Sequence, residues 1–222
     1  MQPRRRPLVR RLGWLGLGAA LAIAMVIAFL VGPLRQRLQP QGLASLQARL
    51  SPDGRLLGHF AYPEASEADL VSLEGGLKLR PAAADALERM LAAARADGID
   101  LRVLSAFRSV AEQERLFFAI KAERNQTARE RARVSAPPGH SEHGTGFAVD
   151  LGDGRQPGSD LNPSFEQSAA YRWLAANAAR FQYTLSFPRG NPQGVAFEPW
   201  HWRFEGSTEA LRLFERSQRL SR

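Results

Sequence analysis

The chain has 222 residues, of which 44% are hydrophobic, and its 30 Lys and Arg against 22 Asp and Glu give a formal net charge of +8. This length and apolar content fit one folded domain with an appendage, and they exclude a disordered tail protein. The absence of cysteine excludes a disulfide framework, a cysteine-ligated zinc site, an iron–sulfur cluster and a thiol nucleophile.

The basic excess is concentrated at the N-terminus. Residues 1–11 contain five arginines and no acidic residue, so most of the net charge lies there. Nucleic-acid binding proteins carry their basic residues as a patch or stripe on the folded domain. A short terminal cluster therefore argues against nucleic acid as a partner.

Residues 12–31 form an uncharged, apolar segment of twenty residues. As a helix this segment would span roughly 30 Å, the thickness of the hydrocarbon core of a bilayer. Five arginines precede it, and only Arg35 and Arg37 follow closely, which predicts an N-terminus inside the cytoplasm by the positive-inside rule. We expect a single-pass anchor in the cytoplasmic membrane, with the rest of the chain outside. A cleaved signal peptide and a buried soluble helix are the alternatives.

The predicted organisation has four parts. Residues 1–11 are a cytoplasmic basic tail, 12–31 the transmembrane anchor, 32–69 a tether and lead-in, and 70–222 the folded domain. The tether is assigned from its proline, glycine and scattered charges. His59, which lies in it, is expected to be a surface histidine.

Hydrophobic periodicity predicts the elements of the folded domain. The expected helices cover residues 81–96, 110–124, 169–181 and 208–220. The expected strands cover residues 99–104, 145–151, 183–187 and 196–204. Mixed elements with short connections favour an α+β fold, with an antiparallel sheet flanked by helices.

Two short segments combine histidine with acidic residues. The first contains His143 and Asp150, and the second contains Glu198 and His201. Two imidazoles and one carboxylate with an open fourth position form a catalytic zinc site, and a further carboxylate can take a proton from the water. By spacing alone, a turn-capping aspartate and histidines that lie at the surface or are hydrogen-bonded in the core remain alternatives.

The residues around these candidates resemble a known family. The pattern SxHxxGxAxD at 141–150, followed by ExWH at 198–201, resembles the VanY-type zinc D-alanyl-D-alanine carboxypeptidases. These belong to a group with the D-Ala-D-Ala dipeptidases and the hedgehog-like fold. SAFRS at 105–109 is similar to another element of the family, with Phe107 in place of the usual tyrosine. The resemblance covers about residues 70–206.

The resemblance implies a role for each matching residue. His143, Asp150 and His201 match the zinc ligands, and Glu198 matches the general base. Further matches are Arg108, which steadies the substrate or its tetrahedral intermediate, Ser141, which contacts substrate, and Gln113, which contacts substrate or orients Arg108. His140 matches no ligand position and is expected to be a spectator or to support a ligand without touching the ion.

The implied function is a zinc-dependent D,D-carboxypeptidase that removes the terminal D-Ala from D-Ala-D-Ala stem peptides of peptidoglycan. An extracytoplasmic domain on a membrane anchor would meet this substrate where it is displayed. The alternatives are an L,D-carboxypeptidase or a peptidoglycan endopeptidase on the same scaffold, and a non-catalytic wall-binding module that contains zinc. The sequence assigns no oligomeric state.

Overall fold

The computed structural model of the chain describes residues 50–220. The chain divides into two units, Met1–Gly42 and Leu43–Arg222, and everything described belongs to the second. The predicted basic tail and the predicted span at 12–31 lie outside the described residues. Among the helices of residues 50–220, none combines the length and the apolar character needed to cross a bilayer.

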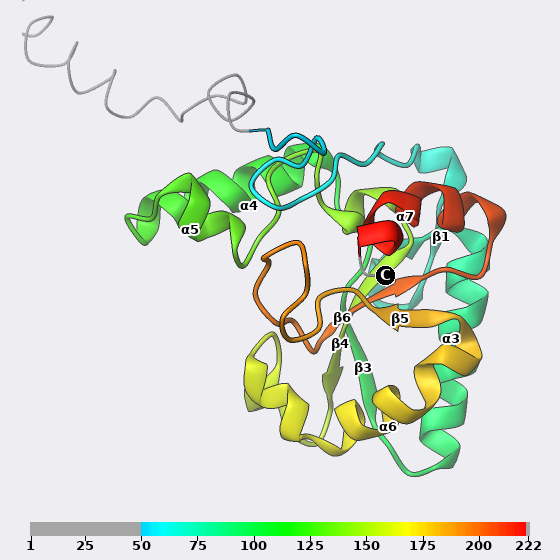
Figure 1. Ribbon diagram of the computed structural model, residues 1–222. Coiled ribbons are helices and arrows are strands. Elements are labelled where there is room, and N and C mark those ends of the chain that lie inside the picture. The colour runs from blue at the N-terminus through cyan, green and yellow to red at the C-terminus, as the bar shows by residue number, and fades with distance from the viewer. Residues whose placement is uncertain (1–49, 221–222) are drawn as a thin grey trace, which may run out of the picture. The chain divides into compact units, whose positions relative to one another are not determined.

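A four-stranded antiparallel sheet forms the centre of the domain, in the order β3–β4–β6–β5 (Figure 1). These strands are β3 (Leu101–Ser105), β4 (Ala148–Asp153), β5 (Tyr183–Leu185) and β6 (His201–Phe204). A hairpin of β1 (Val71–Ser72) and β2 (Lys78–Leu79) precedes them. The helices are α3 (Pro81–Ala96), α4 (Val110–Glu123), α5 (Ala128–Ala132), α6 (Ala169–Asn177) and α7 (Thr208–Leu220). The predicted α+β class and antiparallel sheet are confirmed.

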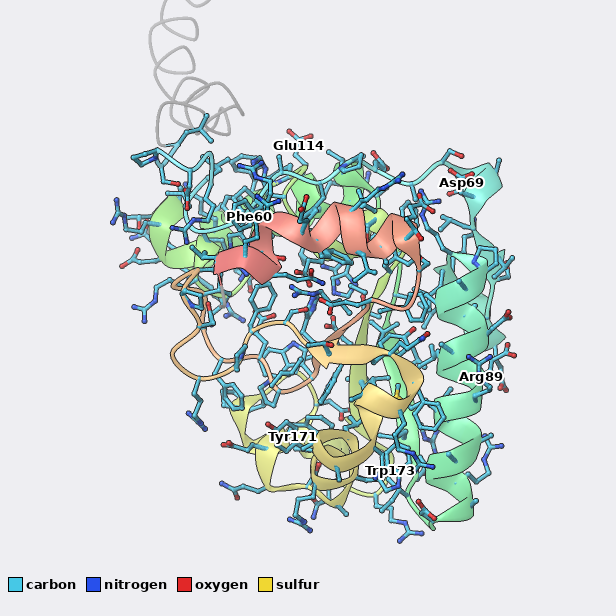
Figure 2. The ribbon with its side chains drawn as sticks, turned by 45° about the vertical axis from the view of Figure 1, so that its right-hand side comes forward. Phe60, Asp69, Arg89, Glu114, Tyr171 and Trp173 are labelled. Atoms are coloured by element: carbon cyan, nitrogen blue, oxygen red, sulfur yellow. The ribbon has the colours of Figure 1, made fainter. Side chains whose placement is uncertain are left out.

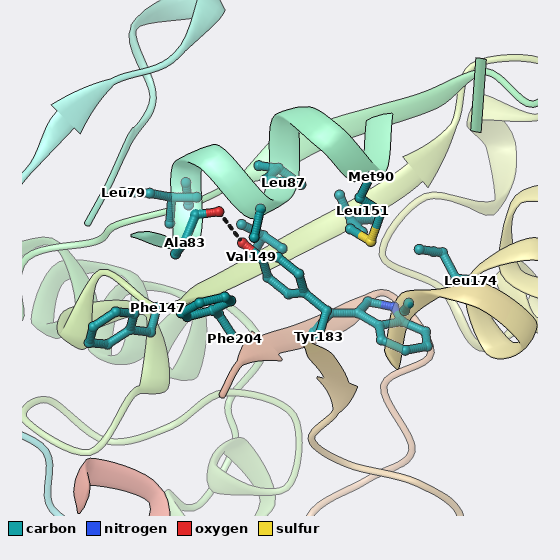
Figure 3. Close-up of a cluster of buried hydrophobic side chains, with 14 of the residues drawn as sticks. Leu79, Ala83, Leu87, Met90, Phe147, Val149, Leu151, Leu174, Tyr183 and Phe204 are labelled. Carbon is teal, nitrogen blue, oxygen red and sulfur yellow. Dashed lines mark hydrogen bonds between the residues drawn. The ribbon is translucent and has the colours of Figure 1, made fainter. Parts of the chain in front are cut away.

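Strand alternation separates the hydrophobic core from the other face of the sheet. Val149 and Leu151 of β4 are fully buried in the core, together with Leu87 and Met90 of α3 (Figure 3). Because side chains alternate along a strand, Asp150 faces the opposite side. Tyr183 is also buried in this core, and its hydroxyl group donates a hydrogen bond to the Ala83 carbonyl at 2.8 Å.

Several predicted boundaries differ from the structure. The helices at 81–96 and 208–220 are confirmed, whereas the strand predicted at 196–204 forms only over its last four residues. The part before it is a loop, in which the Glu198 amide donates to the carbonyl of Phe187, two residues after the end of β5, at 3.1 Å. Helix α5 was not predicted, because five residues are too few to show helical periodicity.

The folded unit begins before residue 70, inside the segment expected to be a tether. Phe60 and Tyr62 join the main core, and Leu56 packs with Phe117 of α4. Phe60 lies near α7, where the Arg216 guanidinium covers its ring at 4.8 Å (Figure 2). The expectation that His59 is a surface residue was wrong, since only 4% of it is exposed. His59 is buried because the apolar residues next to it in the sequence pack into the core.

Candidate functional site

The register of β4 and β6 places Asp150 directly opposite His201. The Oδ1 atom of Asp150 lies 3.1 Å from Nδ1 of His201, and its Oδ2 atom lies 3.2 Å from Nε2 of His143. All three side chains are buried, and one possible ligand atom from each lies within 4.8 Å of the others. The structure therefore brings together the three residues that the sequence proposed as ligands.

His143 is positioned by a tight turn. The 3₁₀ helix Glu142–Thr145 ends at Gly146, whose φ of +73° lies in the left-handed region that favours glycine. A Cβ atom at Gly146 would also lie 2.7 Å from the Leu70 side chain. Nδ1 of His143 lies 2.7 Å from the Ala106 carbonyl. A carbonyl only accepts, so Nδ1 carries the hydrogen and Nε2 is left to bind a cation.

His201 is oriented by Glu142, a residue to which the sequence gave no role. Its Nε2 lies 2.9 Å from Oε2 of Glu142. Glu142 also accepts hydrogen bonds from Ser186 at 2.6 Å and from Arg203 at 3.0 Å. Burial opposes the ionisation of Glu142, but Arg203 and His201 outweigh it and lower its pKa to about 2. The ionised carboxylate accepts from Nε2 of His201, which leaves Nδ1 as the ligand atom.

The donor set and its spacing fit a small divalent cation. Ligands at about 2.0–2.1 Å from a tetrahedral zinc lie roughly 3.3 Å from one another. The separations of 3.1 and 3.2 Å between Asp150 and the two histidines are close to this value, but they start from different oxygens of Asp150. One possible ligand atom from each residue lies within 4.8 Å of the others, which is close enough for the three to hold one ion. Two imidazoles and one carboxylate suit zinc, whereas calcium prefers six to eight oxygen ligands. Three protein ligands leave the fourth position for water or substrate.

Glu198 differs from Glu142 in its partners. Its carboxylate forms no hydrogen bond or ion pair with any other residue between 50 and 220. Burial raises its pKa to about 8, and the neighbouring charge of His201 only partly opposes this. The backbone fixes the position of Glu198, because its carbonyl accepts from the His201 amide at 3.1 Å. A carboxyl group with a raised pKa and no fixed partner can exchange a proton near neutral pH.

The SAFRS element places Arg108 beside the candidate ligands. Nη2 of Arg108 donates to Ser105 at 2.8 Å and lies 3.9 Å from Asp150, while Nη1 donates to Gln113 at 2.9 Å. The Gln113 amide group in turn donates to the Ala136 carbonyl at 2.6 Å. Gln113 thus holds Arg108, and it also lines the cavity, so both roles considered for it stay predictions.

Local backbone structure explains why Arg108 points to this place. Strand β3 ends at Ser105 after a register shift against β4. Ser109 then caps α4 through a reciprocal capping box with Glu112. Arg108 therefore lies on a short connection that is fixed at both ends.

The candidate ligands, Glu198, Arg108 and Gln113 all line one cavity of about 450 Å³. Ser141 is buried and lines the cavity, and its contact with substrate stays a prediction. His140 also lines the cavity, but its Nδ1 bonds to the Pro138 carbonyl at 2.9 Å and it is not part of the ligand cluster. Other lining residues are Leu116, Ile120, Arg131, Phe187, Phe197 and Trp200. The cavity thus joins a polar centre to an apolar wall.

Comparison with known proteins identifies relatives of the chain. The sequence model of the family described as VanY: D-alanyl-D-alanine carboxypeptidase matches residues 76–207. The YodJ protein of Bacillus subtilis (strain 168) is 36% identical over 138 residues, which are 60% of this chain and 48% of that protein. The chain spans about half the length of the curated relatives that it matches.

Solved structures share the fold. The LdcB LD-carboxypeptidase is 30% identical with a TM-score of 0.59, and the match covers 73% of this chain and 80% of that one. A mutant of the vancomycin-resistance D,D-pentapeptidase VanY, solved in complex with Zn(II), is 28% identical with a TM-score of 0.53. That match covers 69% of this chain and 88% of the other. With its family match over more than half of its length, the chain belongs to the VanY family of D-alanyl-D-alanine carboxypeptidases.

Proposed function

We propose that the chain is a zinc-dependent D,D-carboxypeptidase that removes the terminal D-Ala from peptides ending in D-Ala-D-Ala. The observation that carries this proposal is the unengaged Glu198 carboxylate, which shares one cavity with the cluster of His143, Asp150 and His201. A purely structural metal site has no need of such a base. The zinc-bound VanY mutant among the similar structures supports both the metal and the substrate class.

In this mechanism His143, Asp150 and His201 would hold the ion. A zinc ion there would lower the pKa of a water molecule and polarise the scissile carbonyl. Glu198 takes a proton from the attacking water and delivers it to the leaving amine. Arg108, held by Ser105 and Gln113, stabilises the negative charge that develops on the carbonyl oxygen.

The substrate that we propose is the stem peptide of peptidoglycan, and the place of action is outside the cytoplasmic membrane. The sequence supports this location through the five arginines and the uncharged segment at 12–31. We propose a single-pass anchor with its N-terminus inside and the peptidase domain outside.

An L,D-carboxypeptidase on the same scaffold is the second candidate. The similarity to the LdcB LD-carboxypeptidase favours it. Both reactions would use the same ligands and base, so the difference lies in which peptide end the cavity accepts. A D,D-enzyme cleaves pentapeptides that end in D-Ala-D-Ala, whereas an L,D-enzyme cleaves tetrapeptides that end in a single D-Ala.

The test measures D-Ala release by the purified chain from both peptides, with and without a chelator. We expect rapid release from the pentapeptide, its loss on chelation and its recovery with added zinc. Release from the tetrapeptide alone would replace the D,D assignment with the L,D assignment. Release that persists in the chelator would contradict the metal mechanism.

A further inference from the structure

Arg131 of α5 is a buried cation in the same cavity, and the sequence motifs give it no role. Only 6% of the residue is exposed. Its side chain makes no hydrogen bond or ion pair with any residue between 50 and 220, and its Nε atom is buried without a partner. Arg108 and Arg203 also lie near the ligand cluster, and both are engaged. Arg124 lines the same cavity but is exposed to solvent, unlike Arg131.

A buried guanidinium group without an anion is energetically costly. Arginine does not lose its proton in proteins, so it cannot avoid this cost by becoming neutral. The acidic groups of the cavity do not serve as its partner. Asp150 contacts two histidines, and Glu142 contacts Arg203 and His201. The charge of Glu198 favours the ionised guanidinium group of Arg131, but burial outweighs this effect and the two side chains form no ion pair. Arg131 is therefore available for an anion from outside the chain.

The surrounding structure holds Arg131 in place. Helix α5 starts with a capping box between Thr127 and Glu130. Ala128 and Ala132 pack into a small hydrophobic cluster, and the Ala132 carbonyl bonds to the His59 ring at 2.7 Å. These contacts fix both ends of the short helix and keep the guanidinium group of Arg131 at the cavity wall. A group held in this way loses little conformational entropy when it binds a ligand.

We propose that Arg131 binds a carboxylate of the peptide substrate, and this proposal rests on the proposed peptidase function. The planar guanidinium group offers two parallel N–H donors that match the two oxygens of a carboxylate. A carboxypeptidase substrate always has a terminal carboxylate next to the scissile bond. A carboxylate on an inner residue of the peptide has the same chemistry, so it is the second group that Arg131 could bind.

The experiment compares the kinetics of Arg131→Gln and Arg131→Lys with those of the wild-type chain. Arg129→Gln is the matched control, because it removes the same charge from an exposed position on the same helix. Three pentapeptides are used: one with all carboxylates free, one with a C-terminal amide, and one with its inner carboxylates amidated.

We expect Arg131→Gln to raise KM for the free peptide at least about tenfold, as loss of a charged hydrogen bond predicts, with little change in kcat. Arg131→Lys should recover part of this loss, and Arg129→Gln should behave as wild type. If the terminal carboxylate is the ligand, the substitution leaves KM for the C-terminal amide unchanged. If an inner carboxylate is the ligand, Arg131→Gln leaves KM for the internally amidated peptide unchanged.

Other outcomes overturn the proposal. An equal effect on all three peptides, or an effect on kcat with a shifted pH profile, would instead assign Arg131 to the positioning of Glu198. Unchanged kinetics would also overturn it.

If the wild-type chain releases no D-Ala, the proposed function fails, and calorimetric binding of the same peptides then decides the role of Arg131. A tenfold weaker binding of the free peptide by Arg131→Gln would support carboxylate binding by Arg131. Equal binding by the wild type and the variant, or no binding by either, would overturn the proposal.

Discussion

Glu142 accepts a hydrogen bond from Nε2 of His201 at 2.9 Å and so decides which nitrogen of that ring faces Asp150. Two buried side chains, Ser186 and Arg203, hold the Glu142 carboxylate in its turn. The orientation of a candidate metal ligand therefore depends on residues outside the ligand cluster.

We predict that Glu142→Gln weakens zinc binding roughly 10–100-fold, the usual effect of removing such a partner from a ligand. Zinc affinity would be measured by competition with a chromogenic chelator. Glu205→Gln is the matched control, because Glu205 also binds Arg203, at 2.6 Å, and no hydrogen bond or ion pair joins it to His201 within the described residues. Equal zinc affinity in wild type and Glu142→Gln would contradict the orienting role.

Gly146→Ala should destabilise the domain by about 1–3 kcal/mol. The substitution places a Cβ atom where φ is +73° and where the Leu70 side chain is 2.7 Å away. The control is Gly158→Ala, because no atom lies within 4 Å of a Cβ atom built there and its φ is not positive. Urea unfolding of both variants checks the prediction. Equal stability of the two variants would contradict the prediction, because it would show that the turn before β4 accepts a Cβ atom at no cost in stability.

The pH dependence of stability should contain a contribution from His59. Burial is the main cause that lowers its pKa from 6.5 to about 4, although the bond to Ala132 opposes it. Between these values the unfolded chain binds a proton and the folded chain does not. The stability is therefore fully present above pH 6.5 and falls as the pH drops towards 4.

His59 should account for about 2 kcal/mol of the stability lost between pH 7 and pH 5. The measurement is urea unfolding of wild type and His59→Gln at both pH values, with chelator present. The substituted amide can still donate to the Ala132 carbonyl, but it does not titrate. The variant should lose less stability than wild type over this interval, and equal losses would contradict a neutral, buried His59.

The residues of the candidate cluster could be predicted because their chemistry is encoded locally. The pattern at 141–150 fixes a turn and a strand, and ExWH precedes a second strand that pairs with the first. Strand alternation then places Asp150 and His201 on one face. The roles of Glu198 and Arg108 remain predictions until activity is measured.

The supporting residues could not be predicted, because their contacts join distant parts of the chain. Glu142 and Arg203 are 61 positions apart, and nothing in either segment shows that they pair. Arg131 lies in a helix too short for a periodic signal, and His59 lies among prolines, glycines and charges that are typical of a tether. In each case burial by residues far away in sequence decides the outcome.

The central claim is that Glu198 is the base beside one metal ion held by His143, Asp150 and His201. The most direct measurement determines bound zinc and D-Ala release from the pentapeptide for wild type and Glu198→Gln. Glu114→Gln, an exposed position on α4 (Figure 2), is the matched control. We predict one zinc per chain in all three proteins and a loss of about 10²–10⁴ in kcat in Glu198→Gln alone. Full activity of Glu198→Gln with zinc bound would contradict the account.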